Sequence, residues 1–222
     1  MQYRPFGALG WKPSALGFGA MRLPVLDNDP ARIDEPLARK MIYTAIDAGV
    51  NYVDTAWPYH KGESEPFLGR CLAGGYRDRV KLATKLPSWL VKSADQLDTY
   101  LDAHRTRLAT EHIDFYLLHA LNRERWTSLR ELNVFEWAEG AIADGRIGCL
   151  GFSFHDSYDV FTTVVDGYDD WAMCQIQYNY MNEDYQAGTK GLEYAASRGL
   201  AVVVIITTTA SPLEAAYSSP FV

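Results

Sequence analysis

Residues 35–56, EPLARKMIYTAIDAGVNYVDTA, join a helical pattern to an extended run that ends near an acidic residue. The apolar residues predicted to share one helix face are Leu37, Met41, Ala45 and Ile46. Gly49 is typical of the residue that follows a helix C-terminus. The run NYVDTA at 51–56 is a strand candidate. The stretch therefore predicts a crossover helix leading into a parallel strand.

This unit recurs along the chain at spacings of about 30 residues, which suits βα modules. The strand candidates are 14–21, 51–56, 80–86, 113–119, 147–153, 173–179 and 200–206. The helix candidates are 35–49, 63–73, 93–109 with Ser93 as N-cap, 127–143 and 185–197. A parallel sheet of this kind is an open doubly wound sheet or an eight-stranded barrel, and the repeat count favours the barrel.

The opening YRPFGALGWKPS predicts a hairpin that turns at Ala8-Leu9-Gly10 and caps the bottom of the barrel. We therefore expect an α/β fold of the (β/α)8 TIM-barrel type, with an N-terminal hairpin and about seven of the eight strands. Residues 1–222 are expected to form one domain, incomplete at its C-terminus. The Gly17-Phe18-Gly19 segment lacks the third glycine of a Rossmann fingerprint, so it indicates either strand-end packing or close approach to a cofactor.

Composition excludes several classes of protein. The 222 residues carry a formal charge of -7, which argues against nucleic-acid binding because that binding draws on clustered Lys and Arg. No basic segment followed by a long apolar run opens the chain, and no apolar stretch is long enough to span a bilayer, so we expect a cytoplasmic protein without a membrane partner. Cys71, Cys149 and Cys174 lie far apart and are expected to be buried thiols rather than disulfide or metal ligands.

Four polar residues lie at or just beyond the ends of successive strand candidates: Asp54, Tyr59, Lys85 and His119. Each alone has an ordinary structural explanation, as a loop cap, a solvent-facing amine or a core imidazole. In a (β/α) barrel, however, the C-terminal strand ends converge on one mouth, where active sites are built. The four side chains are therefore predicted to form one catalytic group.

Such a group suits carbonyl reduction, in which hydride reaches the carbonyl carbon and a proton reaches the oxygen. Tyr59 is the natural proton donor. A phenol is a weak acid at neutral pH, so a nearby cation such as Lys85 would favour the phenolate. Asp54 would fix the position of Lys85, and His119 would orient the carbonyl oxygen.

With these residues the chain resembles the aldo-keto reductase family. The segments that carry the resemblance, in the family's order from about residue 3 to residue 206, are GFGAMRL, NYVDTAWPYHKGESEPFLGRCL, KLATKLP, IDFYLLHAL, GFSFHDS and QIQYNYMN. The segments GFGAMRLP and GFSFHD are most similar to the bacterial and archaeal branch of the family, whose members often carry a ferredoxin-like cysteine cluster. The resemblance implies the catalytic roles given above.

The resemblance also implies a nicotinamide cofactor across the barrel mouth, NADPH with NADH as an alternative. The residues implied to contact it are Gly19, Met21, Asp54, Ser153, His155 and Gln175. Ser153 has an alternative as a helix N-cap, and Gln175 as a loop-facing strand residue. Trp57 and His60 flank Tyr59 and are expected either to shape the substrate pocket or to pack. No metal is expected.

The resemblance fails at the C-terminal end. The family barrel has an eighth strand and a following loop that binds the adenosine phosphate. Here the sequence after residue 206 is TTTASPLEAAYSSPFV, which resembles neither. Three explanations are open: a truncated gene product, an altered form of a longer sequence, or a gap covered by a partner or a second copy. An unclosed barrel exposes the edges of its outer strands, so self-association is one expectation.

The sequence leaves three functions open. The first is an NADPH-dependent oxidoreductase that reduces an aldehyde or a ketone. The second is a reductase-like binding or regulatory barrel that retains no cofactor effectively. The third is a Schiff-base lyase built on Lys85, which ranks low because Asp54 would keep the amine charged.

Overall fold

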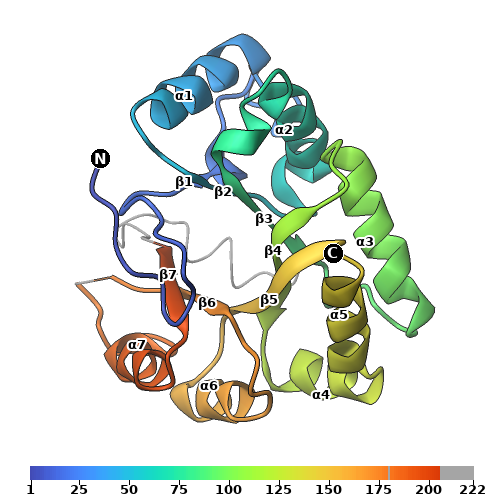
Figure 1. Ribbon diagram of the computed structural model, residues 1–222, viewed down its shortest axis with the longest axis vertical. Helices are drawn as coiled ribbons and strands as arrows, with labels where there is room; N and C mark the ends of the chain where they lie inside the picture. Colours follow the sequence, from blue (N-terminus) through green and yellow to red (C-terminus); the bar gives the residue numbers. More distant parts are fainter. Residues whose placement is uncertain (180, 206–222) are drawn as a thin grey trace.

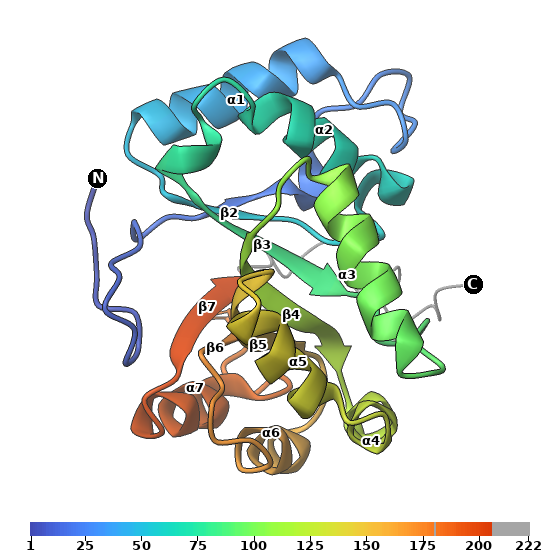
Figure 2. The same cartoon turned by 45° about the vertical axis from the view of Figure 1, so that its right-hand side comes forward.

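A computed structural model describes residues 1–179 and 181–205, and within them seven parallel strands pair in chain order (Figure 1). The strands are β1 (Phe18–Gly19), β2 (Tyr52–Asp54), β3 (Lys81–Leu86), β4 (Ile113–Leu121), β5 (Ile147–Phe154), β6 (Met173–Gln177) and β7 (Ala201–Ile205). The sheet curls, and the helices lie outside it (Figure 1, Figure 2). The predicted α/β barrel-type fold is confirmed. Residue 206 and the tail that follows lie outside the described residues.

The helices are α1 (Glu35–Asp47), α2 (Ser64–Leu72), α3 (Asp95–Arg107), α4 (Arg123–Glu131), α5 (Val134–Ala143), α6 (Tyr158–Val165) and α7 (Gly188–Ser197). The predicted helix 127–143 is wrong in one respect, since it is two helices. Asn122 begins the first by accepting a hydrogen bond from Arg125 N, and Asn133 separates them with a left-handed φ of 54°. Helix α6 was not among the predicted helices.

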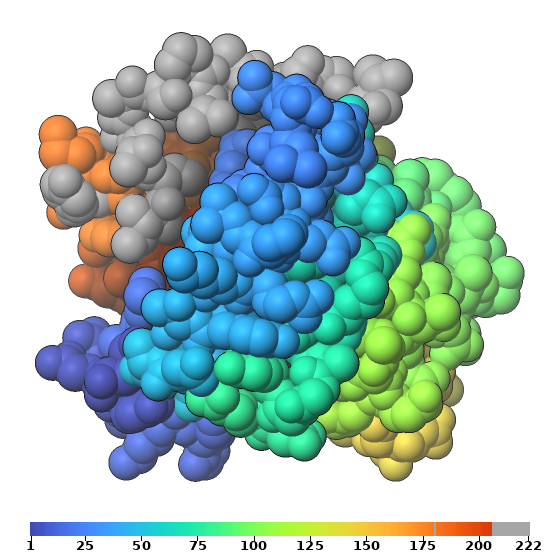
Figure 3. All heavy atoms as spheres, turned by 90° about the horizontal axis from the view of Figure 1, so that it is seen from above, coloured from blue at the N-terminus to red at the C-terminus, as the bar shows by residue number. Residues whose placement is uncertain are grey.

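The buried face of α1 differs from the predicted one. Leu37 and Met41 are exposed, whereas Ala38, Ile42 and Ile46 are buried against the sheet. These three residues are spaced by four and so share a face. Figure 3 shows the outer side of α1, in light blue, as part of the molecular surface.

The start of α1 is fixed locally, because the Asp34 carboxylate accepts a hydrogen bond from Leu37 N at 3.2 Å. The predicted N-cap of α3, Ser93, is wrong, because the cap residue is Ala94 and no side chain caps this helix.

Strand alternation separates the two faces of the sheet. In β3, Leu82, Thr84 and Leu86 are buried on the side of the helices, and in β4 Tyr116 and Leu118 are on the same side. The residues between them point into the barrel, as the two-residue period of a strand requires. The inward side chains near the strand starts are apolar and form one cluster: Phe6, Tyr52, Ala83, Phe115, Leu117, Met173 and Ala201.

The N-terminal hairpin closes the bottom of this interior. It is held by bridges between Tyr3 and Ser14 and between Phe6 and Leu9, so it turns at Gly7-Ala8, one residue before the predicted turn. The Phe6 ring packs edge-to-face on Phe115 at 5.8 Å between centroids. The hairpin also lies beside β7 (Figure 1), where Ala8 N donates to Gly199 O at 3.0 Å.

An ion cluster around Asp114 also lies near the strand starts. The buried carboxylate accepts from Leu82 N at 3.0 Å and pairs with Lys81 at 2.7 Å and Arg77 at 2.8 Å. Burial alone would raise the pKa of Asp114, but the Leu82 N–H and the two cations outweigh it and lower the pKa. This charge therefore stabilises the fold while it is ionised.

The three cysteines are free thiols. Cys71 and Cys174 are buried, whereas Cys149 is only half-buried, contrary to the prediction. Burial raises the pKa of Cys71 and of Cys149 to about 11. Across residues 1–179 and 181–205, no helix has the length and apolar character that crossing a bilayer needs. The same residues contain no group of three or more His, Cys, Asp or Glu side chains that could hold a metal.

Candidate active site

The structure brings the four predicted catalytic side chains to one end of the barrel interior. Lys85 follows Ala83 on the inner face of β3, and His119 follows Phe115 and Leu117 on that of β4. Apolar side chains thus fill the bottom of the interior and polar ones its top. Because parallel strands end at the same edge, this alternation places the polar groups together.

Lys85 is the centre of the group. Its ammonium Nζ donates to Asp54 Oδ1 at 2.6 Å, to the Thr55 carbonyl oxygen at 2.8 Å and to the Tyr59 hydroxyl at 3.2 Å. Burial alone would lower the pKa of Lys85, but the charge of Asp54 and the Tyr59 oxygen outweigh it and raise the pKa. The amine is therefore a buried cation held against the phenol.

His119 lies beside the phenol as a neutral imidazole. Its ring centroid is 6.2 Å from that of Tyr59 and 5.1 Å from that of Trp89. Burial, followed by the nearby charge of Lys85, lowers the pKa of His119 well below its ordinary value. Its Nδ1 atom is buried and has no hydrogen-bond partner within the described part of the chain.

Gln175 and Ser153 pair with one another across β5 and β6, next to the catalytic group. Gln175 Nε2 donates to Asp54 Oδ2 at 3.1 Å, and its Oε1 is buried without a partner among the residues described. Ser153 Oγ accepts from Ala120 N at 2.7 Å, which leaves the hydroxyl hydrogen to donate elsewhere. The N-cap alternative for Ser153 is wrong, because α6 begins after Ser157.

Gly19 pairs with Asp54 in the register of β1 and β2. A Cβ built on Gly19 meets no atom within 4 Å, so open space adjoins the backbone at this point. Met21 follows in a short 3-10 turn, Ala20–Arg22, and is half-buried. His155, also named from the sequence, is exposed and its Nδ1 lies 3.3 Å from Gln186 Oε1.

Trp57 and His60 make packing contacts. The Arg107 guanidinium lies 3.4 Å from the centre of the Trp57 ring, which also packs edge-on against Tyr100. His60 is buried, and its two ring nitrogens contact Leu23 N at 3.0 Å and the Pro30 carbonyl oxygen at 2.8 Å. These contacts correspond to the packing alternative, and they leave His60 no free ring nitrogen for a substrate.

Sequence reasoning missed three residues close to the catalytic group. The Thr55 carbonyl oxygen accepts from Lys85, the Trp89 ring lies 5.1 Å from that of His119, and the Arg125 guanidinium carbon lies 5.4 Å from the centre of the Trp89 ring. Thr55 contributes through its backbone carbonyl, which no residue type reveals. Trp89 and Arg125 follow the ends of β3 and β4. Their positions after successive strands could have indicated that they lie near the barrel mouth.

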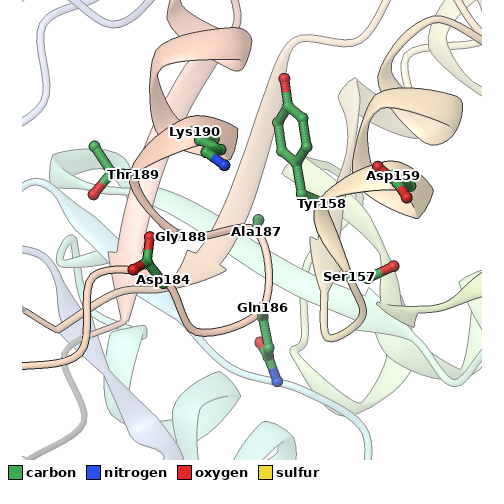
Figure 4. Close-up of a pocket in the computed structure, with 9 residues that line it drawn as sticks. All are labelled: Ser157, Tyr158, Asp159, Asp184, Gln186, Ala187, Gly188, Thr189 and Lys190. Atoms are coloured by element: carbon green, nitrogen blue, oxygen red, sulfur yellow. The ribbon is translucent and has the colours of Figure 1, made fainter.

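A separate hollow of about 430 Å³ lies between the residues that begin α6, 157–159, and the segment 184–190 before and into α7 (Figure 4). Its lining shares no residue with the catalytic group. The ionisable side chains Asp159, Asp184 and Lys190 give it mixed charge.

Comparison with known proteins gives one consistent result. The sequence model of the Aldo/keto reductase family matches residues 15–220. The 6-dehydroglucose reductase of Novosphingobium aromaticivorans is 30% identical over 163 residues, which are 68% of this chain and 51% of that protein. Aflatoxin B1 aldehyde reductase member 2 of Homo sapiens is 34% identical over 133 residues, 58% of this chain and 36% of that protein.

Solved structures agree on the fold. The holo form of an aldo-keto reductase from Bacillus halodurans is 26% identical and superposes with a TM-score of 0.71 over 92% of this chain and 65% of that one. An aldo-keto reductase structure from Pseudomonas aeruginosa, 23% identical, gives a TM-score of 0.75 over 97% of this chain and 82% of that one. The chain spans about half the length, or less, of the curated relatives it matches.

Proposed function

The chain belongs to the aldo/keto reductase family, and from this premise we propose that it is an NADPH-dependent oxidoreductase that reduces an aldehyde or a ketone to an alcohol. The observation that carries the proposal is the Lys85 ammonium, bonded at once to the Asp54 carboxylate and to the Tyr59 hydroxyl. That arrangement joins a proton donor to the cation that stabilises its conjugate base.

The roles of the side chains follow from their contacts. Bound NADPH supplies the hydride for the carbonyl carbon. The Tyr59 hydroxyl gives its proton to the carbonyl oxygen, and the Lys85 charge, 3.2 Å away, stabilises the phenolate that is left. Neutral His119 donates an N–H to the same oxygen and stabilises the charge that develops on it.

The residues present fit a nicotinamide. The unpartnered Oε1 of Gln175 can accept from the carboxamide nitrogen, and the Ser153 hydroxyl hydrogen can donate to the carboxamide oxygen. The open space beside Gly19 allows a flat ring to approach the backbone. These three residues are therefore proposed to hold the cofactor at the mouth.

The raised pKa of Lys85 argues against the lyase alternative. A Schiff-base lysine must lose its proton to attack a carbonyl, and it gains from surroundings that lower its pKa. Here the Asp54 charge and the Tyr59 oxygen outweigh burial and keep the amine protonated.

The test is consumption of NADPH, followed by its absorbance, with a panel of aldehydes. We expect turnover that Tyr59→Phe reduces at least ~100-fold, the scale of a lost general acid. Turnover that Tyr59→Phe leaves unchanged would contradict the assignment. NADH in place of NADPH, compared by kcat/KM, tests the choice of cofactor.

Cofactor titration separates the enzyme from a binding barrel that has lost its cofactor. Micromolar binding of NADPH, weakened about tenfold by Gln175→Leu, is the result expected for the enzyme. Binding weaker than millimolar would favour the binding barrel.

A further inference from the structure

Arg125, in the first turn of α4, places a cation beside the catalytic group. Its guanidinium carbon lies 5.4 Å from the centre of the Trp89 ring, and that ring lies 5.1 Å from the His119 ring. The guanidinium and the imidazole that is proposed to face the carbonyl oxygen thus both lie beside the same indole ring. The Arg125 charge is also among the causes that lower the pKa of His119.

Within residues 1–179 and 181–205 Arg125 makes no ion pair, whereas Arg77, Arg105, Arg146 and Arg198 each pair with a carboxylate. Burial lowers the pKa of Arg125 despite the attraction of Glu124. A half-buried cation without a counter-ion has lost solvation that its contacts with Ala120 and Trp89 restore only in part, so an arriving anion is favoured.

The Arg125 guanidinium has N–H donors that the described contacts do not use. Nη1 donates to the Ala120 carbonyl oxygen at 2.7 Å, and this bond leaves most of its five N–H donors for a ligand. A planar fork of donors matches a carboxylate. Trp89 lies beside both this fork and His119 and provides an apolar ring against which the body of a substrate can pack.

We propose that Arg125 binds a carboxylate carried by the substrate, so that the preferred substrates are aldehydes or ketones bearing a carboxylate a few bonds from the carbonyl. This inference rests on the proposed carbonyl reduction. We assign the carboxylate to the substrate rather than to the cofactor because of where the residues lie. Trp89 and Arg125 follow β3 and β4, whereas Ser153 and Gln175, proposed for the nicotinamide, lie in β5 and β6.

A purely structural role for Arg125 predicts a different result. Ala120, directly after His119, has a left-handed φ of 52°, and Arg125 is bonded to its carbonyl oxygen. If Arg125 served only to hold this bend, its loss would displace His119 and slow all carbonyl substrates equally. Substrate pairs that differ only in charge therefore separate the two roles.

The experiment compares kcat/KM for para-carboxybenzaldehyde and for its methyl ester. Arg125→Gln is expected to lower the acid-to-ester ratio about 10- to 100-fold, the value of one charged hydrogen bond. Arg125→Lys should retain part of the preference. Arg123→Gln, at an exposed arginine two residues earlier in the same helix, should leave the ratio unchanged.

An unchanged ratio in Arg125→Gln, or an equal loss for acid and ester, would overturn the inference while leaving the reductase proposal in place. If neither aldehyde is reduced, the proposed function fails instead. Calorimetric titration with para-(hydroxymethyl)benzoate and its methyl ester then decides the role of Arg125. Binding of the acid that is lost in Arg125→Gln supports the inference, and equal binding to both proteins, or absent binding, refutes it.

Discussion

Lys85→Met removes the buried ammonium while roughly keeping the length and volume of the side chain. Three hydrogen bonds are lost, to Asp54, Thr55 and Tyr59. Tyr59, the proposed proton donor, loses the cation that would stabilise its phenolate, so reductase turnover should fall at least ~100-fold. The structure also predicts a cost to the stability of the fold.

The cost to stability follows from the burial of the pair. The Lys85 side chain is 1% exposed and that of Asp54 9%. Removing one partner of a buried ion pair costs about 3–5 kcal/mol, because the other charge stays buried. Gln175 still donates to Asp54, so we expect the lower end, about 3 kcal/mol. The double variant Asp54→Asn/Lys85→Met should recover part of this loss, since it removes the stranded charge.

Urea unfolding of wild type, the two single variants and the double variant measures this coupling. NADPH consumption at saturating aldehyde, with folding checked by circular dichroism, measures the catalytic part. A folded Lys85→Met protein with near-normal turnover would remove Lys85 from proton delivery. A double variant no more stable than Lys85→Met alone would show that a stranded Asp54 charge is not the cause of the destabilisation.

Two further predictions concern the fold. Asp114→Asn should cost about 1–3 kcal/mol at neutral pH, because the buried network loses its negative charge and one of its two acceptor oxygens. Because the pKa of Asp114 is lowered in the folded protein, its contribution is present above the ordinary Asp pKa and is lost as pH falls through the lowered value. Urea unfolding across that acid range should show the variant and wild type converge, and a constant difference would contradict this. Gly69→Ala should destabilise α2 because the new Cβ would lie 2.7 Å from the Arg107 carbonyl oxygen, whereas Gly140→Ala meets nothing within 4 Å and should stabilise by up to about 1 kcal/mol. Equal effects on the two melting temperatures would refute this packing argument.

Strand order and barrel class were predictable because the apolar residues recur with the two-residue period of strands and the period of about 3.6 residues of helices, in alternation along the chain. The errors have local causes. The exposed face of α1 carries apolar Leu37 and Met41, so the sequence pattern pointed to the wrong side. The break between α4 and α5 depends on the left-handed backbone of Asn133. An asparagine permits this conformation but does not require it, so the sequence did not reveal the break.

The gathering of Asp54, Tyr59, Lys85 and His119 was predictable because each of them ends or follows a strand and carries an unusual side chain for that place. The geometry around it was not predictable. The Thr55 carbonyl and the orphaned Oε1 of Gln175 belong to no motif. That Arg125 has no counter-ion among the described residues is a property of its surroundings, which only the folded chain defines.

The hairpin at the bottom of the barrel affects how folding must proceed. Ala8 bonds to Gly199, so the hairpin reaches this partner only after the strands and helices between them have been made. Contacts of such long sequence separation form late, since a large loop must be closed first. The contact between the hairpin and the start of β7 is therefore expected to form late in folding. Destabilising the hairpin should slow the end of folding more than its beginning.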